Sequence, residues 1–288
     1  MKATVFAPVN VALIKYWGKS DEKLHLPANA SLSVSLTKLG TITTVEWKRN
    51  AEPKITTENN FPMSVGLSSS ASGYAAMTVA MAAAAGLKLS EKELSRLARL
   101  GSGSACRSIP DGWTEWTTGN DKTSYAKTIF PVDHWDLRIL VVILSLKKKP
   151  VSSTAGQELA ATSPYYQDRI KSIAGKLKKI KMAIKQKNFT LMGEIMEADC
   201  LNMHQVMQTQ SPPLNYLLPE TETVMRSIKK WRQDGLESYF TINTGQNVFV
   251  VCEPKTEEKL FDKLSHLRGV IEVRQDKIGP GARIIFPD

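Results

Sequence analysis

The sequence predicts an α+β fold of two lobes, with the active site in the cleft between them. Three observations lead to this prediction. Short β-type segments fill the first third of the chain, a Ser/Gly-rich loop then begins a long Ala-rich helix, and the second half alternates between helices and buried strands. With 288 residues and 42% hydrophobic content, the chain can form one large α/β domain or two subdomains that share a core. We expect an N-terminal lobe over residues 1–150 and a C-terminal helix-and-strand lobe over residues 151–288.

The segments of the first third are short, and several alternate in polarity, which is typical of half-buried strands. We predict strands over residues 3–7, 12–17, 31–36, 41–47 and 54–57, with a turn at 49–53 between the last two. The loop at 64–70 precedes a helix that reaches about residue 85. Ser90 and Glu93 form a capping-box pattern in front of a second helix over residues 91–100.

The second half of the chain contains longer amphipathic segments between apolar runs. We predict helices over residues 164–187, 189–207, 220–234 and 255–267, and strands over residues 137–144, 239–242, 248–252, 271–274 and 282–286. A strand-rich half joined to a helix-and-strand half favours two lobes over a single layered sheet.

The formal net charge of +10 permits a nucleic acid, an anionic membrane or an acidic small substrate as partner. The lysines at 147–149 and between 171 and 187 are predicted to be solvated, and no nucleic-acid motif accompanies them. No apolar run has the roughly 18–20 residues that span a bilayer. Three widely spaced cysteines indicate neither a disulfide framework nor a zinc site. We therefore expect a cytoplasmic protein that binds no nucleic acid, membrane or metal.

Two Gly/Ser-rich stretches are candidate anion sites. The first, over residues 65–73, contains Ser68, Ser69 and Ser70 in front of a helix, whose N-terminal N–H groups suit a phosphate. An ordinary helix cap would have the same composition. The second stretch ends in Arg107, whose guanidinium suits a carboxylate or phosphate, and contains Ser104. A surface turn with a surface arginine is the alternative.

Two further stretches place polar groups at strand ends. Lys15 and Tyr16 fall on opposite faces of an apolar strand, and a lysine buried there requires an anion. The alternative is a lysine that reaches solvent from an edge strand. Asn243 follows the strand predicted at 239–242, where a glycine turn begins, a pattern that any tight turn could share.

Taken in chain order, these stretches resemble diphosphomevalonate decarboxylases. The matching segments are "APVNVALIKYWGK", "LPANASLSVSL", "ENNFPMSVGLSSSASGYAA", "LARLGSGSACRS" and "YFTINTGQNVFVV". This family belongs to the superfamily of galactokinase, homoserine kinase, mevalonate kinase and phosphomevalonate kinase. The resemblance implies an N-terminal lobe like domain 2 of ribosomal protein S5, a ferredoxin-like C-terminal lobe, a phosphorylated mevalonate as substrate in the cleft, and a homodimer.

The resemblance also implies roles for single residues. Lys15 matches the position where a lysine stabilises the phosphate leaving group, and Arg107 matches the arginine that holds the C1 carboxylate. The expected contacts to the substrate's 5-phosphate end come from Tyr16, Lys19, Ser104 and Ser153, and the phosphate-binding loop is Ser68, Ser69 and Ser70. His204 matches a motif histidine to which we assign no role.

Two departures from the family concern the transfer of phosphate from ATP. Asn243 replaces the catalytic aspartate, and an amide cannot accept the 3-hydroxyl proton. The stretch between residues 36 and 58 is much shorter than is usual in the family. We therefore expect an ATP-independent carboxy-lyase that needs no cofactor and converts mevalonate 3,5-bisphosphate to isopentenyl phosphate, with Lys15, Arg107 and Asn243 as catalytic residues.

Three alternatives to this hypothesis remain. The first is a diphosphomevalonate decarboxylase that uses ATP and Mg²⁺ and forms isopentenyl diphosphate. The second is a relative of mevalonate 3-kinases, against which the retained Lys15 argues, because a kinase does not need it. The third is a binding protein without catalytic activity, against which Lys15, Ser104 and Arg107 argue together.

Overall fold

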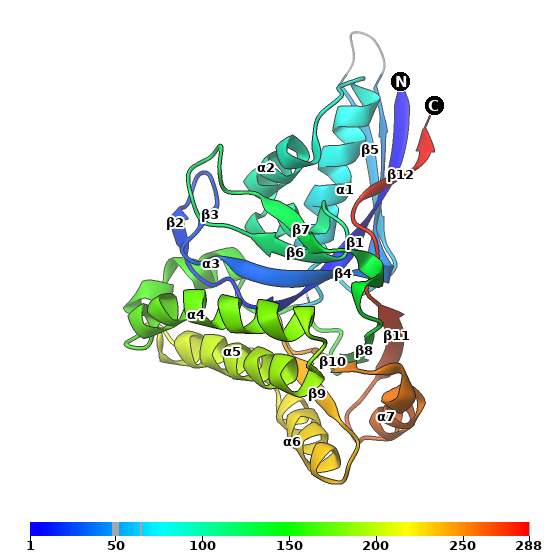
Figure 1. Cartoon of the computed structure of the whole chain (residues 1–288). Coiled ribbons are helices and arrows are strands. Elements are labelled where there is room, and N and C mark those ends of the chain that lie inside the picture. The colour runs from blue at the N-terminus through cyan, green and yellow to red at the C-terminus, as the bar shows by residue number, and fades with distance from the viewer. Residues whose placement is uncertain (48–51, 64, 288) are drawn as a thin grey trace.

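The computed structural model describes residues 1–47, 52–63 and 65–287 and has a two-lobed mixed helix and sheet fold, as predicted (Figure 1). A six-stranded sheet has the order β12-β1-β4-β6-β7, with β5 also paired to β4. Its strands are β1 (Lys2–Ile14), β4 (Ser31–Glu46), β5 (Lys54–Asn59), β6 (Trp113–Trp116), β7 (Ala126–Phe130) and β12 (Arg283–Pro287). Helices α1 (Ser69–Ala84) and α2 (Glu91–Gly101) lie on one side of this sheet.

The second sheet has four antiparallel strands in the order β11-β8-β10-β9. They are β8 (Arg138–Ile143), β9 (Ser238–Thr241), β10 (Val248–Cys252) and β11 (Glu272–Lys277). The remaining α-helices are α3 (Ser153–Glu158), α4 (Tyr166–Lys185), α5 (Phe189–Thr209), α6 (Pro219–Gln233) and α7 (Glu257–Ser265). Helices α5, α6 and α7 contact this sheet, and α4 packs against α5. A small hairpin of β2 (Lys19–Asp21) and β3 (Leu26–Pro27) extends from the first sheet.

Strand β1 differs from the sequence prediction, which broke it into segments at 3–7 and 12–17. It is one long strand, and its pairing with β4 shifts register between Pro8 and Asn10. Proline has no backbone N–H for the ladder, so an irregular register lets β1 continue through Pro8. The strand is buried from Ala3 to Ile14, because elements cover both of its faces, and this removes the polar alternation on which the prediction relied.

The predicted helices and most predicted strands are present, with bounds that differ by a few residues. The capping box at α2 is formed, since Ser90 and Glu93 each bond the other's backbone N–H. Strands β6 and β7 were not predicted from the sequence. A 3₁₀ helix runs over Gly103–Ser108, where the sequence predicts a Gly/Ser-rich loop. The turn predicted at 49–53 falls largely outside the described residues. No helix of the described residues is long and apolar enough to cross a membrane.

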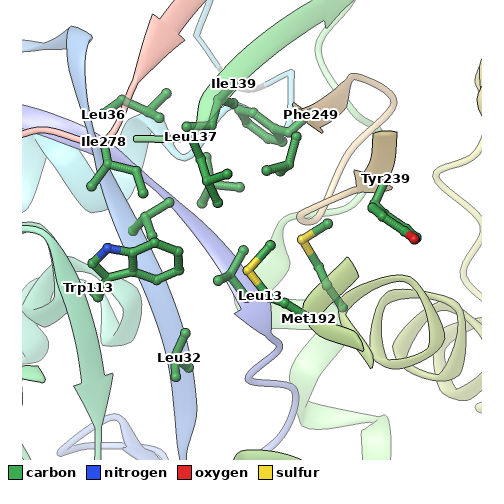
Figure 2. Packing of buried hydrophobic residues seen from close by; sticks show 14 of the residues in the cluster. Leu13, Leu32, Leu36, Trp113, Leu137, Ile139, Met192, Tyr239, Phe249 and Ile278 are labelled. Carbon is green, nitrogen blue, oxygen red and sulfur yellow. The ribbon is translucent and has the colours of Figure 1, made fainter. Parts of the chain in front are cut away.

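One hydrophobic core joins the two sheets. Leu13 and Leu32 from the first sheet lie in the same buried cluster as Ile139 and Phe249 from the second, and Met192 of α5 packs between them (Figure 2). Because the lobes share this core, the polar strand ends that face each other across the cleft have a fixed separation. Strand β8 precedes residue 150 but belongs to the second sheet, and β12 follows it but belongs to the first. The lobe boundary at residue 150 stays a prediction.

Candidate active site

A cavity of about 240 Å³ lies where the two lobes meet. Every site residue predicted from the sequence lines it: Lys15, Tyr16, Lys19, Ser68, Ser69, Ser70, Ser104, Arg107, Ser153 and Asn243. These residues come from segments far apart in the sequence, namely the end of β1, the hairpin β2–β3, the start of α1, the 3₁₀ helix at 103–108, the start of α3 and the turn after β9. The structure thus brings the predicted residues together, while their chemical roles remain predictions.

Lys15 is buried at the end of β1, with 1% of its surface exposed. Its Nζ donates to the backbone oxygen of Ala12 at 2.7 Å and to Oδ1 of Asn243 at 2.9 Å. Burial lowers the pKa of Lys15 from 10.5 to about 8; nearby Cys200 and Asp199 raise this pKa, whereas Arg107 lowers it. Because the Lys15 side chain is buried, the alternative of a solvent-reaching lysine is wrong. The ammonium group is bonded to neutral oxygens, which leaves its charge available to an anion in the cavity.

Asn243 connects Lys15 to the serine loop. Its Nδ2 donates to Oγ of Ser68 at 2.9 Å and to the backbone oxygen of Asn10 at 3.3 Å, while Oδ1 accepts the Lys15 ammonium. The side chain comes from the C-terminal lobe and is therefore fixed by contacts to the N-terminal lobe. Its carbonyl oxygen faces the lysine and its amide group faces the helix α1, so the residue orients its neighbours and has no proton-accepting carboxylate.

The serine loop approaches the turn after β9 closely. Gly66 has φ +86°, and a Cβ atom there would lie 2.4 Å from Cα of Gly245. Only glycine permits both this backbone conformation and this distance. Ser68 also adopts the left-handed region, with φ 62°, immediately before α1. The close approach places the first turn of α1, with Ser69 and Ser70, in the lining of the cavity, where a helix N-terminus suits an anion.

Arg107 is almost completely buried and is held by neutral acceptors. Its Nε and Nη2 atoms donate to Oδ1 of Asn10 at 3.2 and 3.1 Å, and Nη1 donates to Oγ of Ser31 at 2.8 Å. Trp116 lies 6.0 Å from the guanidinium. Burial lowers the pKa of Arg107, but an arginine keeps its charge in proteins. A buried guanidinium without a carboxylate partner is suited to an acidic ligand.

Tyr16 and Lys19 lie on the side of the cavity formed by the hairpin β2–β3. Tyr16 packs edge-on against Trp116 with 4.7 Å between ring centroids, and burial raises the pKa of its phenol. The Lys19 side chain is 3% exposed, and its Nζ pairs with the carboxylate of Glu22. Ser104 accepts a hydrogen bond from Asn10 through its backbone oxygen.

Lys149 is a cavity residue that sequence reasoning missed. The sequence predicts a run of solvated lysines here, and this prediction holds for the exposed Lys147 and Lys148. The Nζ of Lys149 instead donates to Oγ of Ser153 at 2.6 Å and to the backbone oxygen of Thr244 at 2.8 Å. Burial lowers its pKa from 10.5 to about 8. Its position four residues before Ser153 was the available signal, since the resemblance had already assigned Ser153 to the substrate's 5-phosphate end.

Behind Lys15 lies a buried layer that does not reach the cavity. Asp199 is fully buried, accepts the backbone N–H of Lys15 at 2.7 Å and forms an ion pair with Arg169 at 2.9 Å. His204 is 3% exposed, and its Nε2 has no hydrogen-bond partner among the described residues. Burial lowers the pKa of His204 to about 3, and the charge of Lys15 adds to this shift. His204 is therefore neutral, in agreement with a core position.

The fold and the site define a two-lobed protein with a cationic small-molecule cleft. The family model described as the diphosphomevalonate decarboxylase-like N-terminal domain matches residues 7–54 and 47–126, and the mevalonate 5-diphosphate decarboxylase C-terminal domain matches residues 139–278. The chain belongs to the diphosphomevalonate decarboxylase family. The two matches to the N-terminal domain overlap at residues 47–54. This overlap lies between residues 36 and 58, the stretch that is shorter than is usual in the family.

Relatives and solved structures agree with this family. The diphosphomevalonate decarboxylase of Candida albicans is 31% identical over 97% of this chain and 96% of its own length. A structure described as "MDDEF in complex with MVAPP, AMPPCP and Magnesium" has a TM-score of 0.91 and 35% identity, covering 100% of this chain and 99% of its own. A structure on the ATP-binding mechanism of the mevalonate diphosphate decarboxylase from Enterococcus faecalis has a TM-score of 0.88 and 34% identity, covering 100% and 99%.

These comparisons bear on the expectation that no cofactor is used. Similar structures are described with ATP, or with AMPPCP and magnesium, so the comparisons support ATP and Mg²⁺ better than a cofactor-free reaction. Mg²⁺ binds oxygen ligands and usually takes one or two carboxylates besides phosphates. Among the described residues, those that line the cavity offer hydroxyl oxygens but no Asp or Glu. The lining itself does not fit a typical Mg²⁺ site, and we derive no step through a metal.

Proposed function

We propose that this protein is a decarboxylase of the mevalonate pathway whose substrate arrives with phosphate already on carbon 3. The substrate would be mevalonate 3,5-bisphosphate, and the products isopentenyl phosphate, inorganic phosphate and carbon dioxide. The C3–O bond breaks with its electrons going to the departing phosphate. The C1–C2 electrons form the new double bond, and carbon dioxide leaves.

The observation that carries this proposal is Asn243. A decarboxylase that first phosphorylates the 3-hydroxyl needs a group that takes the hydroxyl proton, and an amide cannot serve as that group. The described lining of the cavity contains no Asp or Glu. His204 is buried and is not part of that lining. A substrate that already carries the 3-phosphate needs no such base.

The charges of the cavity suit the elimination step. Negative charge builds on the phosphate as it leaves, and preorganised cations in a buried site stabilise it strongly. Lys15 has neutral hydrogen-bond partners, so its charge is free for this phosphate, and Arg107 is free for the C1 carboxylate. An aspartate at position 243 would add a negative charge beside the standing 3-phosphate, which is unfavourable. The amide removes that repulsion and keeps the hydrogen bonds.

The second candidate is an ATP-dependent diphosphomevalonate decarboxylase that forms isopentenyl diphosphate. The comparisons support this candidate better than the first, because the relatives carry that name and similar structures are described with mevalonate diphosphate and ATP. It requires a proton acceptor other than Asn243. The choice between the candidates therefore depends on whether the substitution at 243 has removed the phosphorylation step.

The test is nucleotide consumption. The purified protein is incubated with mevalonate 5-diphosphate, ATP and Mg²⁺, and ADP is quantified beside Asn243→Asp. We expect no ADP above the protein-free background from the wild type. Stoichiometric ADP and carbon dioxide from the wild type would refute the first candidate and establish the second.

Three earlier expectations remain part of this proposal. They are a cytoplasmic location, a homodimer, and the residue roles given above for the leaving phosphate, the carboxylate and the 5-phosphate end. Size-exclusion chromatography with light scattering would decide the oligomeric state.

A further inference from the structure

Strand β5 is an open edge of the first sheet. It pairs with β4 along its whole length, from Lys54 opposite Glu46 to Asn59 opposite Thr41. Residues 54–58 are exposed. Among the described residues, no element other than β4 forms a hydrogen bond with the backbone of this strand. An open edge of this kind is a template for a further strand.

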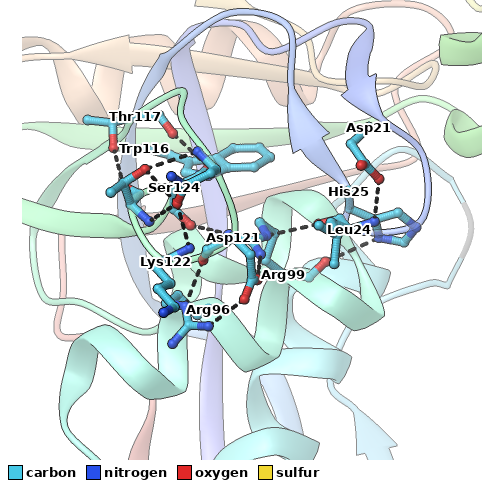
Figure 3. Close-up of polar contacts among 12 residues, drawn as sticks. Asp21, Leu24, His25, Arg96, Arg99, Trp116, Thr117, Asp121, Lys122 and Ser124 are labelled. Atoms are coloured by element: carbon cyan, nitrogen blue, oxygen red, sulfur yellow. Dashed lines mark hydrogen bonds and ion pairs between the residues drawn. The ribbon is translucent and has the colours of Figure 1, made fainter.

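The edge strand β7 of the same sheet is instead held by helix α2. The N–H of Ala126 donates to Oγ of Ser95 at 2.9 Å. In the loop before β7, Asp121 pairs with Arg96 and Arg99 of the same helix (Figure 3). This edge therefore offers less of its backbone to a partner than β5 does.

The other edges of the two large sheets are also covered or interrupted. In the second sheet, an N–H of β9 donates to Glu197 of α5 at 3.0 Å, and a backbone oxygen of β11 accepts from Nζ of Lys38 at 3.2 Å. In the first sheet, β12 contains Pro287, which has no N–H for a ladder. Of the edges in the described part of these sheets, only β5 has neither a side-chain partner for its backbone nor a proline.

One side of β5 carries two opposite charges. Alternate residues of a strand share a side, so Lys54, Thr56 and Glu58 point the same way. Asn59 lies opposite Thr41, whose Oγ1 bonds Ser72 of α1 at 2.7 Å, so the odd-numbered positions face the helix and the other three face away from it. Within the described residues, neither Lys54 nor Glu58 has an ion-pair partner.

We propose that β5 is the surface through which two copies of this chain associate, as antiparallel strands related by a two-fold axis at Thr56. Opposite side chains in such a ladder point to the same side of the sheet. Lys54 therefore lies opposite the partner's Glu58, and the symmetry repeats this ion pair on the other side of the axis. On the face toward α1, Ile55, which is 43% exposed, lies opposite the partner's Thr57.

The charges also select the register of this pairing. An axis at Ile55 or Thr57 would place Lys54 opposite Thr56 or Asn60, so both ion pairs would be lost. Charges of one sign along an edge prevent pairing between copies, whereas opposite charges at equal distances from Thr56 favour it. The inference rests on the proposed function only for the expectation of a homodimer, to which it adds the contact surface.

The test is sedimentation velocity over a range of protein concentrations at low ionic strength, where exposed charges are least screened. Lys54→Glu and Glu58→Lys each turn two attractions into two repulsions, and each should raise the dissociation constant of the dimer by about tenfold. The double variant Lys54→Glu/Glu58→Lys exchanges the charges and restores both pairs, so its constant should return to within about threefold of the wild type. Both positions lie outside the described lining of the cavity, and melting curves establish that each variant is folded.

A cysteine at the axis tests the register independently. Directly opposite Cα atoms of antiparallel strands are about 4.5–5.5 Å apart, which is within reach of a disulfide. Thr56→Cys should form a disulfide-linked dimer on mild oxidation, whereas the matched control Ile55→Cys, which lies opposite Thr57, should not. The native cysteines Cys106, Cys200 and Cys252 are buried and do not compete.

A wild type that sediments as a monomer at every concentration, or a dimer that neither single reversal weakens, would overturn this interface. Weakening that the double variant does not reverse, or a disulfide in Ile55→Cys and not in Thr56→Cys, would overturn the register. Carbon dioxide release from mevalonate 3,5-bisphosphate, measured on the same samples, tests the proposed function separately. A monomeric but active protein leaves that function intact, and a dimer with the expected responses but no release contradicts that function alone.

Discussion

The basic side of the pH–rate profile should report the charge of Lys15. Its pKa of about 8 means that about 90% of the ammonium is protonated at pH 7 and about 10% at pH 9. If the protonated form stabilises the leaving phosphate, kcat/KM should fall roughly tenfold between these pH values. The assay is the initial rate of carbon dioxide release from mevalonate 3,5-bisphosphate at low substrate, from pH 6 to 10.

Asn243→Asp turns this profile into a test of one contact. The new carboxylate would replace an amide oxygen that lies 2.9 Å from Nζ of Lys15. An opposite charge this close favours the ammonium and raises its pKa by about 1–3 units. The basic limb should therefore move from near pH 8 to pH 9 or above. The absolute rate should fall, because the carboxylate repels the 3-phosphate.

Lys149 needs a control, because burial lowers its pKa to about 8 as well. In Lys149→Gln, a basic limb due to Lys15 should persist, and adding Asn243→Asp should still move it. A limb that disappears in Lys149→Gln, or that does not respond to Asn243→Asp, would refute the assignment of the charge to Lys15.

Three further predictions concern the supports of the cavity. Gly66→Ala should lower the free energy of unfolding by at least about 2 kcal/mol and abolish activity, because its Cβ would overlap the backbone of the turn after β9. In the matched control Gly73→Ala the new Cβ meets open space, so the free energy of unfolding should rise by up to about 1 kcal/mol. Urea denaturation measures both changes. Asp199→Asn should lower the free energy of unfolding by about 3–5 kcal/mol, because it breaks a buried ion pair. It should also move the basic limb of the pH–rate profile to lower pH, since the charge of Asp199 raises the pKa of Lys15. A limb at unchanged pH would contradict this coupling. Arg107→Lys should raise KM, because lysine cannot reproduce the contacts of the three guanidinium donors. Expressed as free energies, this effect on KM should exceed the loss of stability in a melting curve, and steady-state kinetics beside that curve would detect the opposite result.

The sequence was informative wherever the signal is local. The capping box of Ser90 and Glu93 predicted the start of α2. The Gly/Ser-rich loop predicted a helix directly after residue 70, and α1 begins two residues earlier, at Ser69. The predicted site residues came from motif segments whose order matched a known family. Their convergence on one cavity could not follow from composition or periodicity, because it depends on the pairing of distant strands.

The contacts that tune the site were not predictable. The hydrogen bond from Arg107 to Asn10 joins residues 97 positions apart in the sequence. The hydrogen bond from the backbone N–H of Lys15 to Asp199 joins residues 184 positions apart. Lys149 was assigned to solvent because a run of lysines is usually solvated, but tertiary structure buries its last member against Ser153. Strand β1 was divided because burial on both faces removes the alternation that marks a strand.

The central claim is that the 3-phosphate arrives with the substrate. Its most direct test is carbon dioxide release by the purified protein from synthetic mevalonate 3,5-bisphosphate, with EDTA present and no nucleotide added. We expect release of one carbon dioxide and one inorganic phosphate per substrate, at a rate that ATP does not change. Absence of release from this substrate, together with ATP-dependent release from mevalonate 5-diphosphate, would contradict it.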